Sequence, residues 1–222
     1  MLPLKDSVRP RKYPYVNLVL LFTNIAIFIF QLSLDEAGLT EFIYRYGVIP
    51  HEFILSQGQV WLPLFTSPFL HGGWFHLLGN MLYLWVFGDN VEDRLGHFGF
   101  FLFYLAAGLA GNFSHIIANP SSLIPTIGAS GAVAGVLGAY FVLFPRARVL
   151  TLIPIGFFIT TARLPAMIFL FLWFLLQFFN AFLAGLNPGA QTVAWWAHIG
   201  GFLLGCIIAI AALIKKKLAG VP

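Results

Sequence analysis

The chain has 222 residues, of which 59% are apolar, 17% are aromatic and only 9% are charged. Soluble domains carry roughly 25% charged residues, so this composition excludes a soluble globular domain, a disordered chain and a nucleic-acid-binding module. The net charge of +4 follows the predicted membrane topology and does not indicate a nucleic-acid partner. With one cysteine, Cys206, the chain cannot form an internal disulfide. The composition is that of a helical protein that crosses the lipid bilayer several times.

The apolar stretches between the charges predict six transmembrane helices. A span needs about 20 apolar residues, and turn-forming sequences at 119–122 and 185–189 divide the two longest uncharged blocks. The predicted helices lie near residues 15–33, 74–91, 98–118, 128–144, 164–184 and 193–213. The expected fold class is therefore an all-α membrane protein, with a single domain over residues 1–222.

Two further segments are apolar without qualifying as spans. Residues 34–73 are rich in aromatic and aliphatic side chains but are interrupted by glycine and proline. We expect this external segment to lie on or partly in the outer leaflet. Residues 149–162 are apolar but short, and they contain Pro154 and Gly156. They are predicted to form an interfacial connection between two helices.

Basic residues gather in the segments that would lie on one side of this six-helix arrangement. All Lys and Arg residues except Arg45 lie before the first helix, in the second and fourth connections, or after the last helix. Positively charged loops face the cytoplasm, so both termini are predicted to be cytoplasmic. The short tails and the lack of an Arg- and Ser-rich transit segment favour a prokaryotic plasma membrane.

Four polar residues are predicted to share one depth in the membrane. His76 and Asn80 lie one turn apart on one helix, Ser130 begins another, and His198 lies near the start of the last. All four lie within roughly 10 Å of the outer helix ends. Polar residues inside a membrane are costly and mark candidate functional sites. Glycines near Ser130 and His198 would let their helices approach closely.

Each of these residues also has a purely structural reading. A serine in a membrane helix usually bonds to its own backbone, and a lone membrane histidine is more often a packed polar residue than a base. Asn80 alone could join two helices through a hydrogen bond. Only the shared depth of the four side chains favours a chemical site.

The acidic residues argue against a Ser-His-Asp triad. The chain has no Asp or Glu after residue 93. Asp89, Glu92 and Asp93 are expected to cap the far end of their own helix, and Glu92 lies about 24 Å along it from His76, too far to orient His198. The lack of a mid-membrane carboxylate also argues against an aspartyl protease or a transporter. No HExxH motif occurs, so we expect a Ser-His dyad that uses neither a metal nor a cofactor.

At this point four motifs match a known family in the right order. They are His76-x-x-x-Asn80, Gly88-x-x-x-Glu92-x-x-x-Gly96, Gly128-x-Ser130-Gly131 and Ala197-His198-x-Gly200-Gly201. The run from Trp61 to Trp74 is also similar. Over nearly its whole length the chain resembles the rhomboid intramembrane serine proteases of the basic six-helix form.

The resemblance implies hydrolysis of peptide bonds in or next to the transmembrane helices of other membrane proteins. Ser130 would be the nucleophile and His198 the general base. His76 and Asn80 would donate hydrogen bonds to the oxyanion. The alternative is a non-catalytic, rhomboid-like protein that binds transmembrane segments. The presence of both Ser130 and His198 favours the protease.

The chain departs from the family pattern at two places. Leu62 follows Trp61 where the family often has arginine, so the external segment must be held in place differently. Ala134 stands four residues after Ser130, where some members have an aromatic residue against the histidine ring. His198 must therefore be oriented by other groups, which the sequence does not identify.

Overall fold

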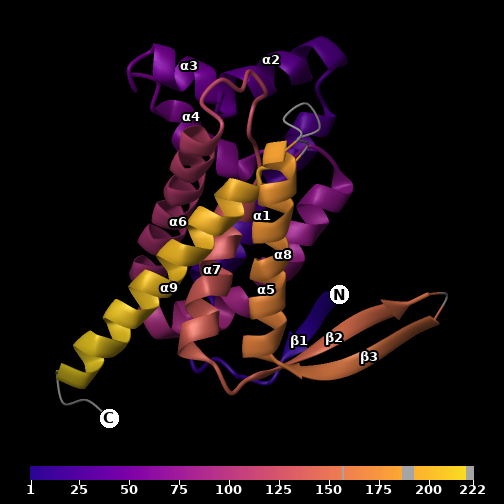
Figure 1. The fold of residues 1–222 in the computed structure, drawn as a ribbon, viewed down its shortest axis with the longest axis vertical. Coiled ribbons are helices and arrows are strands. Elements are labelled where there is room, and N and C mark those ends of the chain that lie inside the picture. Colours follow the sequence, from indigo (N-terminus) through magenta and orange to yellow (C-terminus); the bar gives the residue numbers. More distant parts are fainter. Residues whose placement is uncertain (157, 187–192, 219–222) are drawn as a thin grey trace.

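The computed structural model describes residues 1–156, 158–186 and 193–218, and in this part of the chain six long helices form a bundle (Figure 1). They are α1 (Tyr15–Leu32), α5 (Trp74–Leu95), α6 (His97–Ala118), α7 (Ser130–Leu143), α8 (Ala166–Leu186) and α9 (Trp195–Leu218). The shortest of them, α7, lies at the centre, and every residue from Gly131 to Tyr140 is buried. The bundle therefore packs around α7.

Each predicted span overlaps one of these helices. Four of them, α1, α6, α8 and α9, are long and apolar enough to cross a membrane, so the chain is a mostly helical membrane protein. By contrast, α5 carries charged residues in its last turns and α7 is short. The predicted break at 185–189 begins later than expected because Gly185 and Leu186 belong to α8. Residues 187–192 lie outside the described part of the chain.

The fold is mostly helical, as expected, but the expectation of an all-α protein needs correction, because a small sheet lies at one end of the bundle. β1 (Leu2–Asp6), β2 (Arg148–Ile155) and β3 (Phe158–Pro165) pair antiparallel in the order β1-β2-β3. The predicted interfacial connection is the hairpin β2–β3, which projects sideways from the bundle (Figure 1). The segment is too short to span and rich in β-branched residues, so it satisfies its backbone groups by strand pairing. We call this end of the bundle the sheet end.

Residues 34–73 cover the opposite end, which we call the loop end (Figure 1). They form α2 (Glu36–Tyr46), α3 (Pro50–Leu55), α4 (Leu62–Thr66) and the 3-10 turn η1 (Ser67–Phe69). Two hydrogen bonds attach α4 to its neighbours. The Thr66 hydroxyl donates to the Tyr46 carbonyl at 2.8 Å, and the Asn112 amide donates to the Leu64 carbonyl at 2.9 Å. These contacts hold the segment although leucine replaces the expected arginine at position 62.

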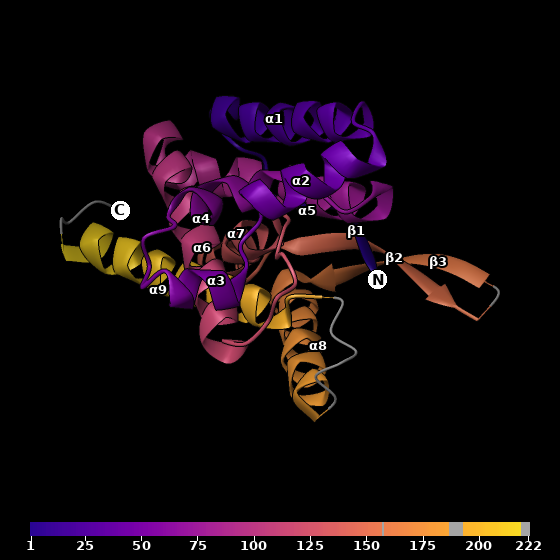
Figure 2. The ribbon, with the colours of Figure 1, turned by 90° about the horizontal axis from the view of Figure 1, so that it is seen from above.

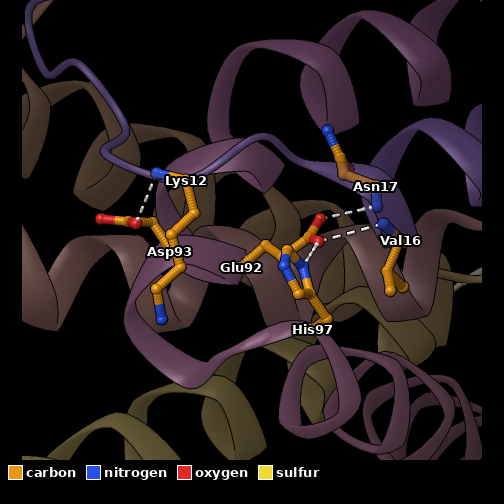
Figure 3. A network of polar contacts seen from close by, with 6 residues as sticks. All are labelled: Lys12, Val16, Asn17, Glu92, Asp93 and His97. Carbon is orange, nitrogen blue, oxygen red and sulfur yellow. Dashed lines mark hydrogen bonds and ion pairs between the residues drawn. The ribbon is translucent and has the colours of Figure 1, made fainter.

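At the sheet end, Glu92 stabilises the start of another helix rather than the end of its own (Figure 3). Its carboxylate accepts hydrogen bonds from the backbone N–H groups of Val16 at 3.0 Å and Asn17 at 2.7 Å. Both are free donors in the first turn of α1. His97 contacts the same carboxylate. The expectation that Glu92 caps the end of its own helix therefore needs correction, since the buried carboxylate joins α5 to α1.

Small residues set the spacing between α7 and α9. A side chain at Gly201 would place its Cβ 1.9 Å from the Gly131 carbonyl oxygen, and one at Gly205 would lie 2.0 Å from the Gly135 carbonyl oxygen. A Cβ at Gly138 would lie 2.0 Å from the Phe202 carbonyl oxygen. These distances are too short for any side chain. The two helices thus meet backbone to backbone, as small residues permit in membranes.

Candidate active site

Ser130 is the first residue of α7, at the loop end of the bundle. Gly128, two residues earlier, has φ of +121°, a conformation that favours glycine. Its N–H donates to the Ser67 carbonyl at 2.9 Å, which ties the approach to α7 to the η1 turn. The N–H groups in the first turn of a helix have no partner within the helix. The backbone N–H of Ser130 is therefore a free donor beside its own hydroxyl, at the positive end of the helix dipole.

His198 is the fourth residue of α9, at the end of its first turn, and is almost fully buried. Its Nδ1 atom lies 2.9 Å from Oε1 of Gln177 on α8. The amide of Gln177 is itself oriented, since its Nε2 donates to the Trp173 carbonyl at 3.2 Å. The amide oxygen therefore faces His198, and Nδ1 of the ring must carry the proton to make this bond. Nε2 of His198 is then the unprotonated nitrogen, which is the state a general base needs.

Two tryptophans flank the ring of His198. The centroid of Trp173 lies 6.0 Å away at an interplanar angle of 33°, and that of Trp195 lies 5.9 Å away at 88°. Ala134, in contrast, is buried inside α7. In some family members an aromatic side chain on the nucleophile helix packs against the histidine ring. Here Trp173 on α8 and Trp195 on α9 make that contact instead.

The contact between α7 and α9 brings Ser130 and His198 to the same level. Their chain neighbours Gly131 and Ala197 meet directly, because a Cβ at Gly131 would lie 3.5 Å from the Ala197 carbonyl oxygen. Among the hydrogen bonds of the described residues, none joins Ser130 to His198 directly. In apo structures such catalytic hydrogen bonds are often long and form only with substrate bound.

His76 and Asn80 both face the turn that precedes Ser130. A Cβ at Gly128 would lie 2.5 Å from Nε2 of His76 and 3.8 Å from Nδ2 of Asn80. The Gly72 N–H approaches Nδ1 of His76 at 3.4 Å, so Nε2 carries the proton and points toward Gly128. Nδ2 of Asn80 is buried without a hydrogen-bond partner. Two side-chain donors therefore converge beside the backbone that leads to Ser130.

A cavity of about 630 Å³ opens at the loop end beside one of these donors, His76, while Asn80, Ser130 and His198 are not among its lining residues. His76 and His115 line it, together with the loop between α6 and α7 and with Gly185, Val193 and Ala194. The His115 ring contacts the Asn119 amide at 3.3 Å. The cavity is large enough for a peptide segment and water, and it reaches the candidate site from one side.

Sequence reasoning missed Gln177 and His115. Both are buried polar residues in helices that are otherwise mainly apolar, and the rule that polar residues at membrane depth mark function applies to them as well. Gln177 lies on the helix predicted at 164–184, 21 residues before His198, and it belongs to none of the recognised motifs. Within the described residues, no group of three or more His, Cys, Asp or Glu side chains is placed to hold a metal.

A model of the rhomboid domain matches residues 57–215, which include all four predicted site residues. The chain belongs to the rhomboid family. Rhomboid protein 1, mitochondrial, of Saccharomyces cerevisiae is 31% identical over 210 residues, covering 90% of this chain and 55% of the relative. Rhomboid-like protein 11, chloroplastic, of Arabidopsis thaliana is 28% identical over 211 residues, covering 92% of this chain and 68% of the relative.

A third rhomboid relative has a name that states an activity. Rhomboid protease GluP of Bacillus subtilis is 39% identical over 121 residues, covering 54% of this chain and 23% of the relative. This chain therefore spans only part of the length of several curated relatives. As a rhomboid protein it is a multi-pass integral membrane protein, and its relatives include rhomboid proteases.

Proposed function

We propose that this rhomboid protein is an intramembrane serine endopeptidase. It hydrolyses peptide bonds in or next to the transmembrane helices of other membrane proteins. The observation that carries the proposal is the bond between Gln177 and His198, which leaves Nε2 of His198 free to accept a proton. Among the hydrogen bonds of the described residues, none involves Nε2 of His198, whereas a buried histidine with a purely structural role usually has its ring nitrogens bonded.

In the first step Nε2 of His198 takes the proton of the Ser130 hydroxyl as Oγ attacks the scissile carbonyl. The imidazolium then gives this proton to the leaving amine, and an acyl-enzyme forms at Ser130. A water molecule, activated by His198 in the same way, releases the second product. Gln177 is a positioning residue, since it fixes which nitrogen acts and makes no contact with the substrate.

The tetrahedral intermediate carries its negative charge on the former carbonyl oxygen. Nδ2 of Asn80, Nε2–H of His76 and the backbone N–H of Ser130 can donate to this oxygen. Asn80 supports this role best because its amide is buried and bonded to nothing else. One such donor contributes roughly 3–4 kcal/mol in the transition state.

The substrate must reach Ser130 with its backbone exposed. The carbonyls of a transmembrane helix are bonded within the helix, so the substrate has to unwind locally before the attack. The cavity lined by His76 and His115 gives an unwound segment and water a place beside His76, one of the proposed oxyanion donors. This requirement favours substrates with helix-breaking residues near the membrane edge.

The test is cleavage of a model single-span substrate by the purified protein in liposomes. We expect cleavage by the wild type and none by Ser130→Ala or His198→Ala. A fluorophosphonate probe should label the wild type and not Ser130→Ala. Ser130→Ala should keep the wild-type unfolding temperature, and it is the variant that separates loss of chemistry from loss of fold. His198→Ala removes a buried, hydrogen-bonded side chain and should unfold at a lower temperature.

Two results would overturn the proposal. Cleavage that persists in Ser130→Ala would mean that another nucleophile acts. A wild type that neither cleaves nor reacts with the probe would favour the non-catalytic alternative, a rhomboid protein that only binds transmembrane segments.

A further inference from the structure

The hairpin β2–β3 at the sheet end is uncharged along most of its length. Between Arg148 and Arg163 no Asp, Glu, Lys or Arg occurs. Both arginines lie where the hairpin joins the bundle, since Arg148 pairs with Pro165, the residue before α8. We call this end of the hairpin its root, and residues 153–156 and 158–160 its tip. The hairpin thus has a charged root and an uncharged tip.

The root packs against the bundle, and the tip does not. Val149 and Thr151 are fully buried, as is Ala166, which follows β3 directly. By contrast, Phe158 and Ile159 are 79% and 71% exposed. Neighbouring residues of a strand point to opposite faces of the sheet. The tip therefore presents a large apolar side chain on each of its two faces, and the bundle covers neither.

The tip lies beside the membrane-spanning helices. Figure 1 shows that the hairpin leaves the bundle sideways and that its tip is closer to the loop end than its root is. Figure 2 shows that the hairpin extends beyond the outline of the bundle. The spanning helix α8 begins at the root, and its first-turn side chains Met167 and Ile168 are exposed. In a rhomboid protein the exposed surface of such a helix contacts lipid, so the tip lies at a level where lipid is the neighbour.

The charges and the backbone of the hairpin set how deep it can lie. Among the side chains that the structure describes, the one ion pair within 4.0 Å joins His97 to Glu92, so Arg148 and Arg163 are available to lipid phosphates. The outer edge of β3 leaves backbone groups unpaired, and such groups are not tolerated at the centre of the bilayer. Both features favour the boundary between headgroups and acyl chains, where apolar faces are buried by about 5–10 Å.

We propose that the β2–β3 hairpin is a membrane anchor whose tip inserts into the leaflet at the sheet end. Phe158 and Ile159 contact the acyl chains, and Arg148 and Arg163 bind lipid phosphates. Since β3 continues directly into α8, the anchor also fixes the level at which this helix enters the membrane. The anchor is independent of the proposed protease activity.

Spin labels on the full chain in phosphatidylcholine liposomes measure the depth of the tip. The one cysteine, Cys206, is first replaced by alanine. Phe158→Cys and Ile159→Cys then report on the tip, and Arg146→Cys, at an exposed residue just before β2, is the aqueous control. Oxygen concentrates in lipid, and a nickel chelate stays in water. We expect the ratio of oxygen to nickel accessibility to be several-fold higher at both tip positions than at the control. Equal ratios would overturn the proposal.

The same labels distinguish lipid from a second copy of the chain. Tip labels that are covered by protein would be inaccessible to both reagents, and labels on two paired hairpins would broaden each other's spectra. Either result would overturn the proposal. In lipid, the labels should stay accessible to oxygen, and dilution with unlabelled protein should leave their spectra unchanged.

A charge placed at the tip should withdraw it from the leaflet. With the label on Phe158→Cys, Ile159→Asp should lower the accessibility ratio toward that of the aqueous control. Thr161→Asp is the matched control, because it adds the same charge on the same face of β3, two residues closer to the root. Its effect should be much smaller. Equal losses would mean that the charge disturbs the sheet itself, which would refute the anchor. Ser130→Ala should leave the ratio unchanged, whatever the outcome for the proposed protease activity.

Discussion

Nδ1 of His198 lies 2.9 Å from Oε1 of Gln177, and this contact joins α9 to α8 across the candidate site. The Gln177 amide cannot rotate freely, because its nitrogen is bonded to the Trp173 carbonyl. In a Ser-His-Asp triad a carboxylate fixes the imidazole tautomer. Here a neutral amide does so, in a part of the chain that contains no acidic residue.

Replacing Gln177 should slow catalysis without preventing substrate binding. In Gln177→Leu the imidazole loses the bond that fixes its tautomer, which is worth about 1 kcal/mol and corresponds to about fivefold in kcat. KM should change little. Asn180→Leu is the control, since Asn180 lies one turn further along α8 and is only half-buried. An equal loss in both variants would show that Gln177 acts only through the packing of α8.

Asn80→Ala should lower turnover by roughly 100- to 1000-fold, the usual effect of removing one oxyanion donor. The residual activity should remain measurable because His76 and the Ser130 backbone still donate. Asn24→Ala is a matched control in α1, where the amide donates to the Leu20 carbonyl at 2.7 Å away from the site. That variant should change stability rather than kcat. An unchanged rate in Asn80→Ala would exclude the oxyanion role.

Gly201→Ala should destabilise the protein by about 1–3 kcal/mol, because overpacked helices must move apart. The added Cβ would overlap the Gly131 carbonyl oxygen, and any separation of α7 from α9 moves Ser130 away from His198. Activity should fall with stability. Gly99→Ala in α6 is the control, since its Cβ would meet only Leu95 at an ordinary 3.7 Å. The stability of both variants is measured by thermal unfolding in detergent. An equal loss of stability in Gly201→Ala and Gly99→Ala would contradict this account of the packing.

Glu92→Ala should destabilise the sheet end of the bundle by about 2–3 kcal/mol. It leaves the N–H groups of Val16 and Asn17 without an acceptor, and hydrogen bonds to charged groups are costly to lose. Asp93→Ala removes only an exposed bond to the Lys12 backbone and should have a much smaller effect. Chemical unfolding of both variants measures the difference, and similar midpoints would refute the role of Glu92.

The pH dependence of stability should change in Asp6→Asn. Burial raises the pKa of Asp6 above its ordinary value of 3.8 in the folded state. Its favourable contribution is therefore fully present below pH 3.8 and is lost as the pH rises through the folded pKa. Asparagine does not titrate, so the variant should lose less stability over this range. Identical pH profiles for the two proteins would mean that Asp6 is not perturbed by folding.

The amino-acid sequence alone determined where the membrane helices lie and which polar residues share a depth. Long uncharged stretches leave few alternatives to helices in lipid, because every backbone group must be bonded within the segment. The candidate residues Ser130, His198, His76 and Asn80 followed from their positions near helix ends. Such inferences depend only on local composition and spacing, which the chain carries directly.

Tertiary structure alone decided how these residues are held. Gln177 meets His198 because α8 packs beside α9, and no spacing along the chain indicates that contact. Glu92 caps α1 although it lies more than seventy positions away in sequence, where local rules expect it to cap its own helix. The sheet could not be predicted locally either, because its strand β1 at the N-terminus pairs with β2, which follows α7 in the chain. Contacts between segments that are distant in the sequence depend on how the helices of the bundle pack. The local pattern of apolar and polar residues does not indicate that packing.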